Sequence, residues 1–173
     1  MAALPSRDAT VLDVATGSGD LLVTLARRAP TLRLIGLDRH ATTLDEARGV
    51  AVGSLVRGDA LALPFDDASV DVVISTMFLH HLPDDVAVSA LAEMRRVARH
   101  AVVVADLIRD ARAYRWIRLF TALSSPMVRH DARASVAHAF TMAEFARIAR
   151  RAGLNDARLE RTFGHRFALT WKR

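Results

Sequence analysis

The sequence predicts an α/β fold: a single doubly wound, mostly parallel sheet with helices on both faces and an antiparallel hairpin at its C-terminal end. Short β-branched runs alternate with longer stretches of helical periodicity, which is typical of this class. The chain has 173 residues, 51% of them hydrophobic, enough for one buried core and too few for two ordinary domains. The last segment, ARLERTFGHRFALTWKR, alternates in polarity around a Gly164-His165 turn, which indicates the hairpin.

Each expected element follows from its local pattern. β-branched and apolar runs predict strands at 10–14, 33–37, 54–57, 70–75 and 101–106. Helical periodicity predicts crossover helices at 20–29, 41–51 and 84–98, then an Arg-rich amphipathic segment at 110–123 and a helix at 142–152. The last helix should begin with a capping box, because Thr141 and Glu144 stand three residues apart, and Gly153 fits its C-terminal end.

Composition narrows the function classes. The net charge is +5, but all 24 basic residues except Lys172 are arginines, and they are scattered along the chain, which argues against a nucleic-acid-binding face. The absence of cysteine excludes disulfides and thiolate metal sites, and we expect no metal. No uncharged apolar run reaches about 18 residues, so we expect no membrane span and a cytoplasmic location.

The stretch VLDVATGSGD, residues 11–20, places a glycine turn between a strand and a helix. Gly17 and Gly19 match the first two positions of a dinucleotide fingerprint, but Leu22 occupies the third. Asp20 would also set a negative charge where phosphates bind a helix N-terminus. The pattern therefore favours a ligand that needs close approach of the backbone, carries a ribose and lacks phosphate.

Two further carboxylates follow strands. Asp38 ends RLIGLD, 19 residues after Gly19, where a carboxylate can accept hydrogen bonds from both hydroxyls of a ribose. Asp59, in RGDALALPF, follows the next strand and could accept a hydrogen bond from the exocyclic amine of an adenine. Because the carboxyl ends of parallel strands share one edge, the glycine turn and both acids should meet there.

These motifs together resemble class I S-adenosylmethionine-dependent methyltransferases, which have a Rossmann-like sheet, and the likeness covers nearly the whole chain. VLDVATGSGD resembles their nucleotide-binding turn, with Ala15 where most members have glycine. GDALALPFDDASVDVVIS resembles the ubiquinone and menaquinone methyltransferase branch. The Pro-Gly-Gly turn of that branch is missing, since MRRVARHAVVVADLIRD runs from helix to strand with His100 alone between them. In this respect, and in MVRHDARASVAHAFTMAEF, the chain is more similar to small-molecule tailoring methyltransferases.

The resemblance implies one methyltransferase domain over 1–173, with a cofactor half at about 8–107 and a substrate-covering segment at about 108–141. It implies S-adenosylmethionine as the cofactor. The residues that would shape its methionine site are Asp13, Ala15, Thr16, Gly17 and Gly19, with Ser75 and Thr76 holding the amino group. Asp38 would bind the ribose, Asp59 and the backbone of Ala60 the adenine, and Arg39 would either stack on the cofactor or lie in solvent.

A base is expected in STMFLHHLPDD, directly after the fourth strand. His80 is the first choice and His81 the second, with Asp106 at the end of the fifth strand as an orienting partner; the alternative is that the histidines only pack in the scaffold. Met77, His130 and Asp131 are weaker candidates for contact with the substrate.

The expected function is transfer of a methyl group to a small-molecule acceptor, a hydroxyl or phenol of a polyketide- or quinone-like metabolite. A nucleic-acid methyltransferase is one alternative, although Ser75-Thr76-Met77-Phe78 stands where those enzymes carry Asn/Asp-Pro-Pro-Tyr/Phe. A truncated or non-catalytic partner subunit is the other, because only nine residues precede the first expected strand, so that the N-terminal lid helices are short or missing. The oligomeric state stays open.

Overall fold

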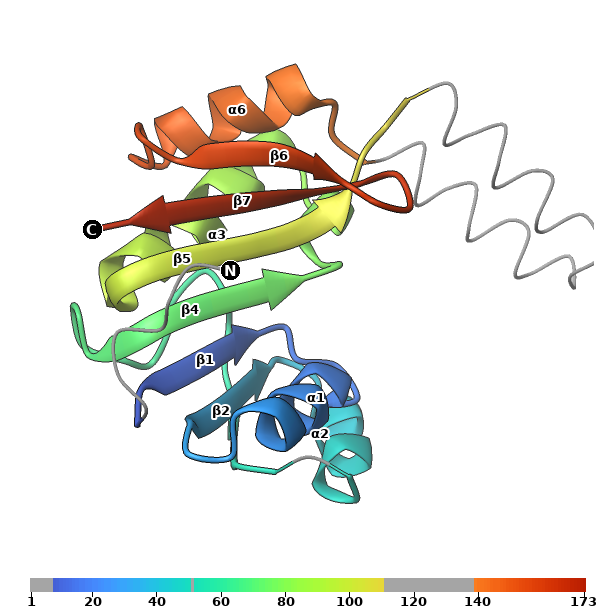
Figure 1. Cartoon of the computed structure of the whole chain (residues 1–173), viewed down its shortest axis with the longest axis vertical. Helices are drawn as coiled ribbons and strands as arrows, with labels where there is room; N and C mark the ends of the chain where they lie inside the picture. The colour runs from blue at the N-terminus through green and yellow to red at the C-terminus, as the bar shows by residue number, and fades with distance from the viewer. Residues whose placement is uncertain (1–7, 51, 111–138) are drawn as a thin grey trace, which may run out of the picture.

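A computed structural model describes residues 8–50, 52–110 and 139–173. One seven-stranded sheet runs through them in the order β3-β2-β1-β4-β5-β7-β6 (Figure 1). The strands are β1 (Thr10–Val14), β2 (Arg33–Asp38), β3 (Ser54–Arg57), β4 (Val70–Thr76), β5 (Ala98–Leu107), β6 (Arg158–Thr162) and β7 (Arg166–Lys172). The first five pair in parallel, and β7 pairs antiparallel with both β5 and β6. The predicted fold class is confirmed.

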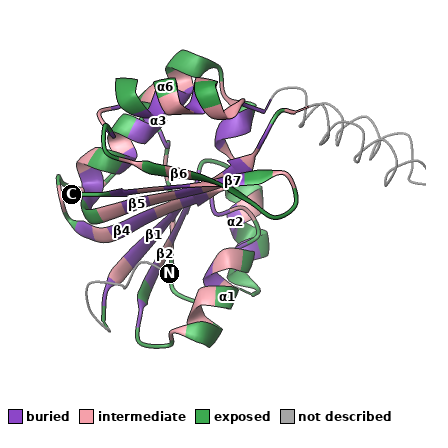
Figure 2. Cartoon of the chain, turned by 45° about the horizontal axis from the view of Figure 1, so that its top comes forward, coloured by how far each residue is buried: buried purple, intermediate pink, exposed green. Residues whose placement is uncertain are grey.

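Helices cover the two faces of the sheet. They are α1 (Asp20–Arg28), α2 (Ala41–Arg48), α3 (Asp84–Val97), α6 (Met142–Arg151) and a short 3₁₀ helix, η1 (Leu79–His81). Figure 2 shows α3 and α6 on one side of the sheet and α1 and α2 on the other. The larger hydrophobic cluster joins α3 and α6 to the sheet, and a smaller one packs Leu22 of α1 against β1 and β2. No helix among the described residues is long and apolar enough to span a membrane.

The sheet order places an open crevice where the site was predicted. Connections from β1 run outward to β2 and β3, whereas β4 and β5 lie on the other side of β1. In such sheets the carboxyl ends of the strands on either side of this reversal diverge, and ligands bind between them. The glycine turn leaves β1 at this point, with Ala15, Gly17 and Gly19 all in the left-handed region at φ of 60°, 57° and 81°.

Some element bounds differ from the prediction. Helix α2 ends at Arg48 instead of residue 51, and α3 passes directly into β5 at Ala98. His100 therefore lies inside the strand instead of in a connecting turn. The polar start of β5 did not look like a strand because Arg99 and His100 are exposed, and its pairing is made by the backbone, with Ala98 opposite Val70 of β4. The segment 110–123 lies outside the described residues apart from Asp110, as do His130 and Asp131.

The C-terminal part confirms two local predictions. Helix α6 begins with a complete capping box, in which Glu144 N donates to Thr141 Oγ1 at 3.2 Å and Thr141 N donates to Glu144 Oε2 at 2.8 Å. Gly153 follows the helix in the left-handed region at φ 83°. The hairpin of β6 and β7 turns through Gly164 and His165, as expected.

Candidate functional site

A first cavity of about 470 Å³ opens at the carboxyl ends of β1, β2 and β3. Five of the predicted cofactor residues line it: Ala15, Asp38, Arg39, Asp59 and Ala60. It is bounded on the other side by Phe78, His81, Leu82 and Val86. The cavity therefore lies between the glycine turn and the segment that follows β4, where the reversal of the sheet predicted a ligand site.

Asp38 connects the glycine turn to the end of β2. Its carboxylate accepts hydrogen bonds from Gly17 N at 3.2 Å and His40 N at 3.0 Å. The His40 ring nitrogen Nδ1 lies 3.4 Å from the same carboxylate. These donors fix the side chain, which is almost fully buried, with its oxygens at the wall of the cavity.

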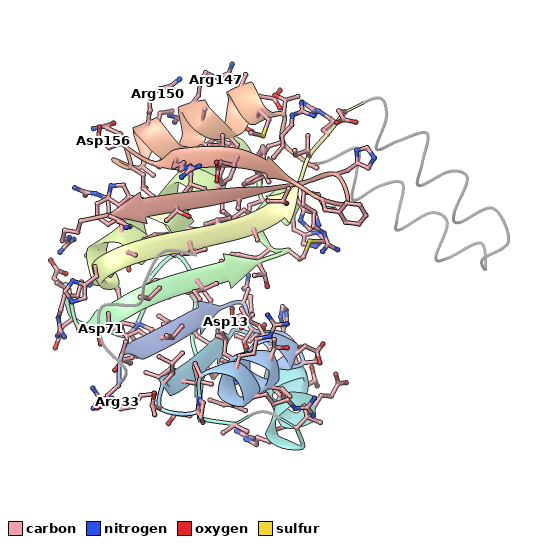
Figure 3. All side chains as sticks on the ribbon, in the orientation of Figure 1. Asp13, Arg33, Asp71, Arg147, Arg150 and Asp156 are labelled. Carbon is pink, nitrogen blue, oxygen red and sulfur yellow. The ribbon has the colours of Figure 1, made fainter. Side chains whose placement is uncertain are left out.

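Asp13 lies behind the turn, near the carboxyl end of β1 (Figure 3). Its Oδ2 accepts a hydrogen bond from Thr16 Oγ1 at 2.7 Å, while Oδ1 is buried with no hydrogen-bond partner among the described residues. Burial raises the pKa of Asp13 to about 6; the Thr16 hydrogen bond opposes the rise, and the nearby charge of Asp38 adds to it. The folded chain thus holds an incompletely satisfied acid beside the turn.

The loop that carries Asp59 and Ala60 is held by α3. Asp59 Oδ1 accepts from Leu61 N at 3.0 Å, which shapes the turn itself. Arg96 uses all five of its N–H donors: two to Glu93, one to Asp67, and two to the backbone oxygens of Leu63 and Phe65. Glu93 in turn accepts from Leu63 N at 2.9 Å. The Glu93–Arg96 pair therefore fixes the loop from the inner side.

Two predicted cofactor residues on β4 do not line the first cavity as the structure describes it. The hydroxyl of Ser75 is buried and donates to Val14 O at 2.9 Å, so this side chain joins β4 to β1. Thr76 ends the strand. Met77 follows in the left-handed region at φ 54°, with its N–H donating to Ala105 O at 2.9 Å. The role of Ser75 and Thr76 in holding an amino group stays a prediction.

A second cavity, of about 480 Å³, lies on the other side of the segment after β4. Its lining comes from η1, the start of α3, the chain just after β5 and the start of α6: His80, His81, Leu82, Pro83, Asp84, Arg109, Ala139, Phe140 and Glu144. His81 and Leu82 line both cavities and form the wall between them. Two binding spaces thus meet at one short segment.

His80 and Asp106, the predicted base and its partner, are in direct contact. His80 Nδ1 lies 2.6 Å from Asp106 Oδ1, and the His80 backbone N–H donates to Asp106 Oδ2 at 3.2 Å. Asp106 is fully buried, and His80 is 3% exposed. A carboxylate accepts, so Nδ1 carries a proton, and in the neutral imidazole Nε2 has the lone pair; Nε2 has no hydrogen-bond partner among the described residues. The His81 ring lies 3.9 Å from the His80 ring.

Several lining residues were not predicted. In the first cavity they are Leu37, His40, Gly58, Leu61, Phe78, Leu82 and Val86, most of which carry no chemistry that a sequence motif would reveal. In the second cavity, Arg109 and Glu144 stand out because they form an ion pair. Glu144 gave a signal only for helix capping, and the position of Arg109 directly after the fifth strand was the available clue to its place.

Comparison with known proteins identifies the class. The methyltransferase domain family matches residues 11–101, just over half of the chain. The chain belongs to this family, and the predicted resemblance to class I S-adenosylmethionine-dependent methyltransferases is confirmed. Demethylmenaquinone methyltransferase of Roseiflexus castenholzii is 39% identical over 108 residues, which are 61% of this chain and 44% of that protein. Release factor glutamine methyltransferase of Mycobacterium leprae is 35% identical over 153 residues, 77% of this chain and 49% of that protein.

The chain thus spans less than half the length of these relatives. Solved structures agree on the fold. A SAM-dependent methyltransferase from Aquifex aeolicus superposes with a TM-score of 0.73 at 19% identity, over 98% of this chain and 84% of that one. The plantazolicin methyltransferase BpumL, in complex with SAH, gives a TM-score of 0.79 at 12% identity, over 95% of this chain and 76% of that one.

Replacement of Asp13 by Asn should change how stability depends on pH. The folded-state pKa is raised, so the protonated form favours the fold below the unfolded pKa near 4, and this contribution disappears as pH rises through about 6. The free energy of unfolding of the Asn variant, relative to wild type, should therefore rise over this interval by about 3 kcal/mol at most and then level off. Urea unfolding at a series of pH values measures the difference, and a difference that does not vary with pH would contradict the assignment.

Replacement of Arg96 by Ala should release the loop that carries Asp59. Five hydrogen bonds are lost and two backbone oxygens lose their donor, so we expect a loss of about 1–3 kcal/mol of unfolding free energy and faster amide exchange at Leu63. Arg99→Ala is the matched control, because its guanidinium is half exposed and such pairs contribute about 0–1 kcal/mol. Equal effects of the two variants on amide exchange would show that Arg96 does not hold the loop.

Proposed function

We propose that this chain binds S-adenosylmethionine in the first cavity and transfers its methyl group to an oxygen of a small molecule held in the second. The observation that carries the proposal is the wall between the cavities, where a buried histidine oriented by Asp106 stands next to the segment that both cavities share. A donor and an acceptor bound in adjoining spaces meet at such a wall, and a base is placed there for the proton of the acceptor.

The residues of the first cavity fit this cofactor. Its volume lies within the roughly 300–1,000 Å³ that ligand cavities span. Asp38 and Asp59 place carboxylates at neighbouring strand ends, where they suit a ribose and an adenine amine. The unsatisfied Asp13 Oδ1 is an acceptor that a cationic, donor-bearing ligand would relieve. A side chain built at Gly17 would meet no atom within 4 Å, so the turn borders open space.

The chemistry asks mainly for alignment and for removal of a proton. When bound, S-adenosylmethionine supplies a sulfonium whose methyl–sulfur bond breaks as the methyl–oxygen bond forms, leaving S-adenosylhomocysteine. His80 Nε2 takes the proton of the acceptor hydroxyl, and solvent receives it after the transfer. Asp106 fixes the tautomer that exposes Nε2 and stabilises the imidazolium that forms. His81 and Leu82 hold the two ligands apart except at the reacting atoms.

The second cavity, next to His80, indicates the class of acceptor. Among the described residues, the cavity beside His80 is lined by side chains of one chain, and its volume of about 480 Å³ suits a small molecule. The demethylmenaquinone methyltransferases, with up to 41% identity over the matched region, support a quinone-like small molecule as the acceptor, and the histidine beside the cavity favours a hydroxyl as the group methylated. We therefore propose a small hydroxylated metabolite as the acceptor, the cytoplasm as the location, and a single domain over the whole chain.

Binding of S-adenosylhomocysteine by calorimetry tests the cofactor site. We expect a measurable affinity for it, with NAD giving nothing comparable. Asp38→Ala should weaken binding by about 1–3 kcal/mol, because the hydroxyls of a buried ribose lose their acceptor. Asp45→Ala removes an exposed carboxylate on α2 and should leave the affinity unchanged. An Asp38 variant that binds as tightly as wild type would remove Asp38 from the site.

His80→Ala should lower turnover by about 10²–10⁴-fold while the affinity for S-adenosylhomocysteine barely moves. The measurement is release of S-adenosylhomocysteine with a panel of hydroxybenzenes and dihydroxynaphthalenes as acceptors. Asp106→Asn should also be slow, because it no longer fixes the tautomer, and His81→Ala should lose much less. A His80 variant with wild-type turnover would refute the assignment of the base; one that loses cofactor binding or unfolds would show that His80 belongs to the scaffold.

A further inference from the structure

Arg109, which lines the second cavity, has N–H groups that donate to no acceptor among the described residues. Arg109 follows β5, and its Nη2 donates to both carboxylate oxygens of Glu144, at 2.6 and 2.7 Å. Among the described residues, its Nε and Nη1 groups donate no hydrogen bond, so three of its five N–H donors remain. These donors belong to a side chain that lines the same cavity as His80.

The ion pair with Glu144 orients Arg109 and occupies only its Nη2 group. Glu144 is itself fixed, because its Oε2 also accepts from Thr141 N in the capping box. The Thr141 backbone hydrogen bond, with the Arg109 guanidinium beside it, keeps the pKa of Glu144 below its usual range, so the carboxylate stays charged. Arg109 N donates to Phe140 O at 3.0 Å, which ties the backbone on both sides of the cavity together. The ion pair therefore orients the guanidinium at the wall of the cavity, on a side chain that is 44% exposed to solvent.

Besides Arg109, two carboxylates line the cavity, Asp84 and Glu144. Asp84 is the first residue of α3 and Glu144 lies in the first turn of α6, and the positive end of each helix partly offsets its carboxylate. Both oxygens of Glu144 already accept hydrogen bonds. Among the described residues, the Nε and Nη1 groups of Arg109 have no acceptor, and oxygen atoms of a ligand in this cavity could accept from them.

We propose that the second cavity selects acceptors that carry a carboxylate next to the hydroxyl to be methylated, with Arg109 as the specificity-determining residue. The planar guanidinium recognises such oxygens through charge-assisted hydrogen bonds, whereas a neutral group of the same shape accepts them more weakly. The reacting hydroxyl then lies toward His80 Nε2. The inference rests on the proposed function and adds to it the chemical class of the substrate.

Three probes of nearly equal size separate charge from shape: 2-hydroxybenzoate, 2-hydroxybenzamide and 4-hydroxybenzoate. Each is titrated into protein saturated with S-adenosylhomocysteine, with binding followed by ligand-observed NMR. We expect 2-hydroxybenzoate to bind about 10- to 100-fold more tightly than the amide, as the difference between charged and neutral hydrogen bonds implies. The 4-hydroxy isomer should bind less tightly than the 2-hydroxy isomer, because its carboxylate and hydroxyl cannot reach both groups at once.

Arg109→Gln should abolish the preference for the carboxylate over the amide while the amide still binds, which shows that the cavity has survived. Arg109→Gln combined with Glu144→Gln removes the unpaired carboxylate and should give the same loss. Arg147→Gln, on the same helix as Glu144 and exposed, is the matched control and should keep the full preference. A wild-type chain that binds S-adenosylhomocysteine but shows no preference, or an Arg109 variant that keeps it, would overturn the inference and leave the proposed function standing. Failure of S-adenosylhomocysteine to bind at all would count against the proposed function itself.

Discussion

The contact between Asp106 and His80 is the interaction on which the arrangement of the site depends. One buried carboxylate accepts from the ring and the backbone of His80 and from its own neighbour, Leu107 N, at 2.7 Å. It therefore joins the end of β5 to the short segment after β4. Because that segment carries His81 and Leu82, the same contact places the wall between the two cavities. Loss of one partner would leave a charged group buried without compensation, which is costly in any fold.

Three of the described carboxylates, Asp13, Asp38 and Asp106, lie buried at or near the carboxyl ends of strands, and they are not equally satisfied. Asp38 accepts from two backbone donors and Asp106 from three, counting the ring of His80. Asp13 has one oxygen without a partner among the described residues and the raised pKa that follows from burial. The difference is informative. Asp38 and Asp106 are held in place by donors of the chain itself, whereas Asp13 has an oxygen to which a ligand can contribute the missing interaction.

Much of the fold could be predicted from the sequence because its signals are local. Strand and helix periods, the glycine turn and the Thr141–Glu144 capping box all act within a few residues, and the structure reproduces them. Where the prediction differed, the cause was a partner distant in the sequence: the polar start of β5 pairs through its backbone with β4, where Ala98 lies opposite Val70.

In the site too, contacts between strand ends could be predicted from the sequence, whereas contacts between distant segments could not. Asp38, Asp59 and the His80–Asp106 contact were expected, because the ends of parallel strands share an edge and their spacing can be read from the sequence. Ser75 was expected to help hold the amino group of the ligand; its hydroxyl donates to Val14 O, and that role stays a prediction. The Arg109–Glu144 pair joins residues 35 apart across a segment with no local signal for it.

Arg96 and Arg109 differ in how many of their N–H groups already donate within the protein. Arg96 and Arg109 each pair with a glutamate, and a sequence gives no reason to rank one above the other. Arg96 spends all five N–H groups on Glu93, Asp67 and backbone oxygens, so nothing remains for a ligand and its role is to hold the loop beneath the first cavity. Arg109 spends one nitrogen on Glu144 and keeps two within a cavity wall. The Arg109 side chain is 44% exposed, so solvent satisfies these donors in the free protein. An acceptor bound in the cavity beside His80 would replace that water with charge-assisted hydrogen bonds to the guanidinium.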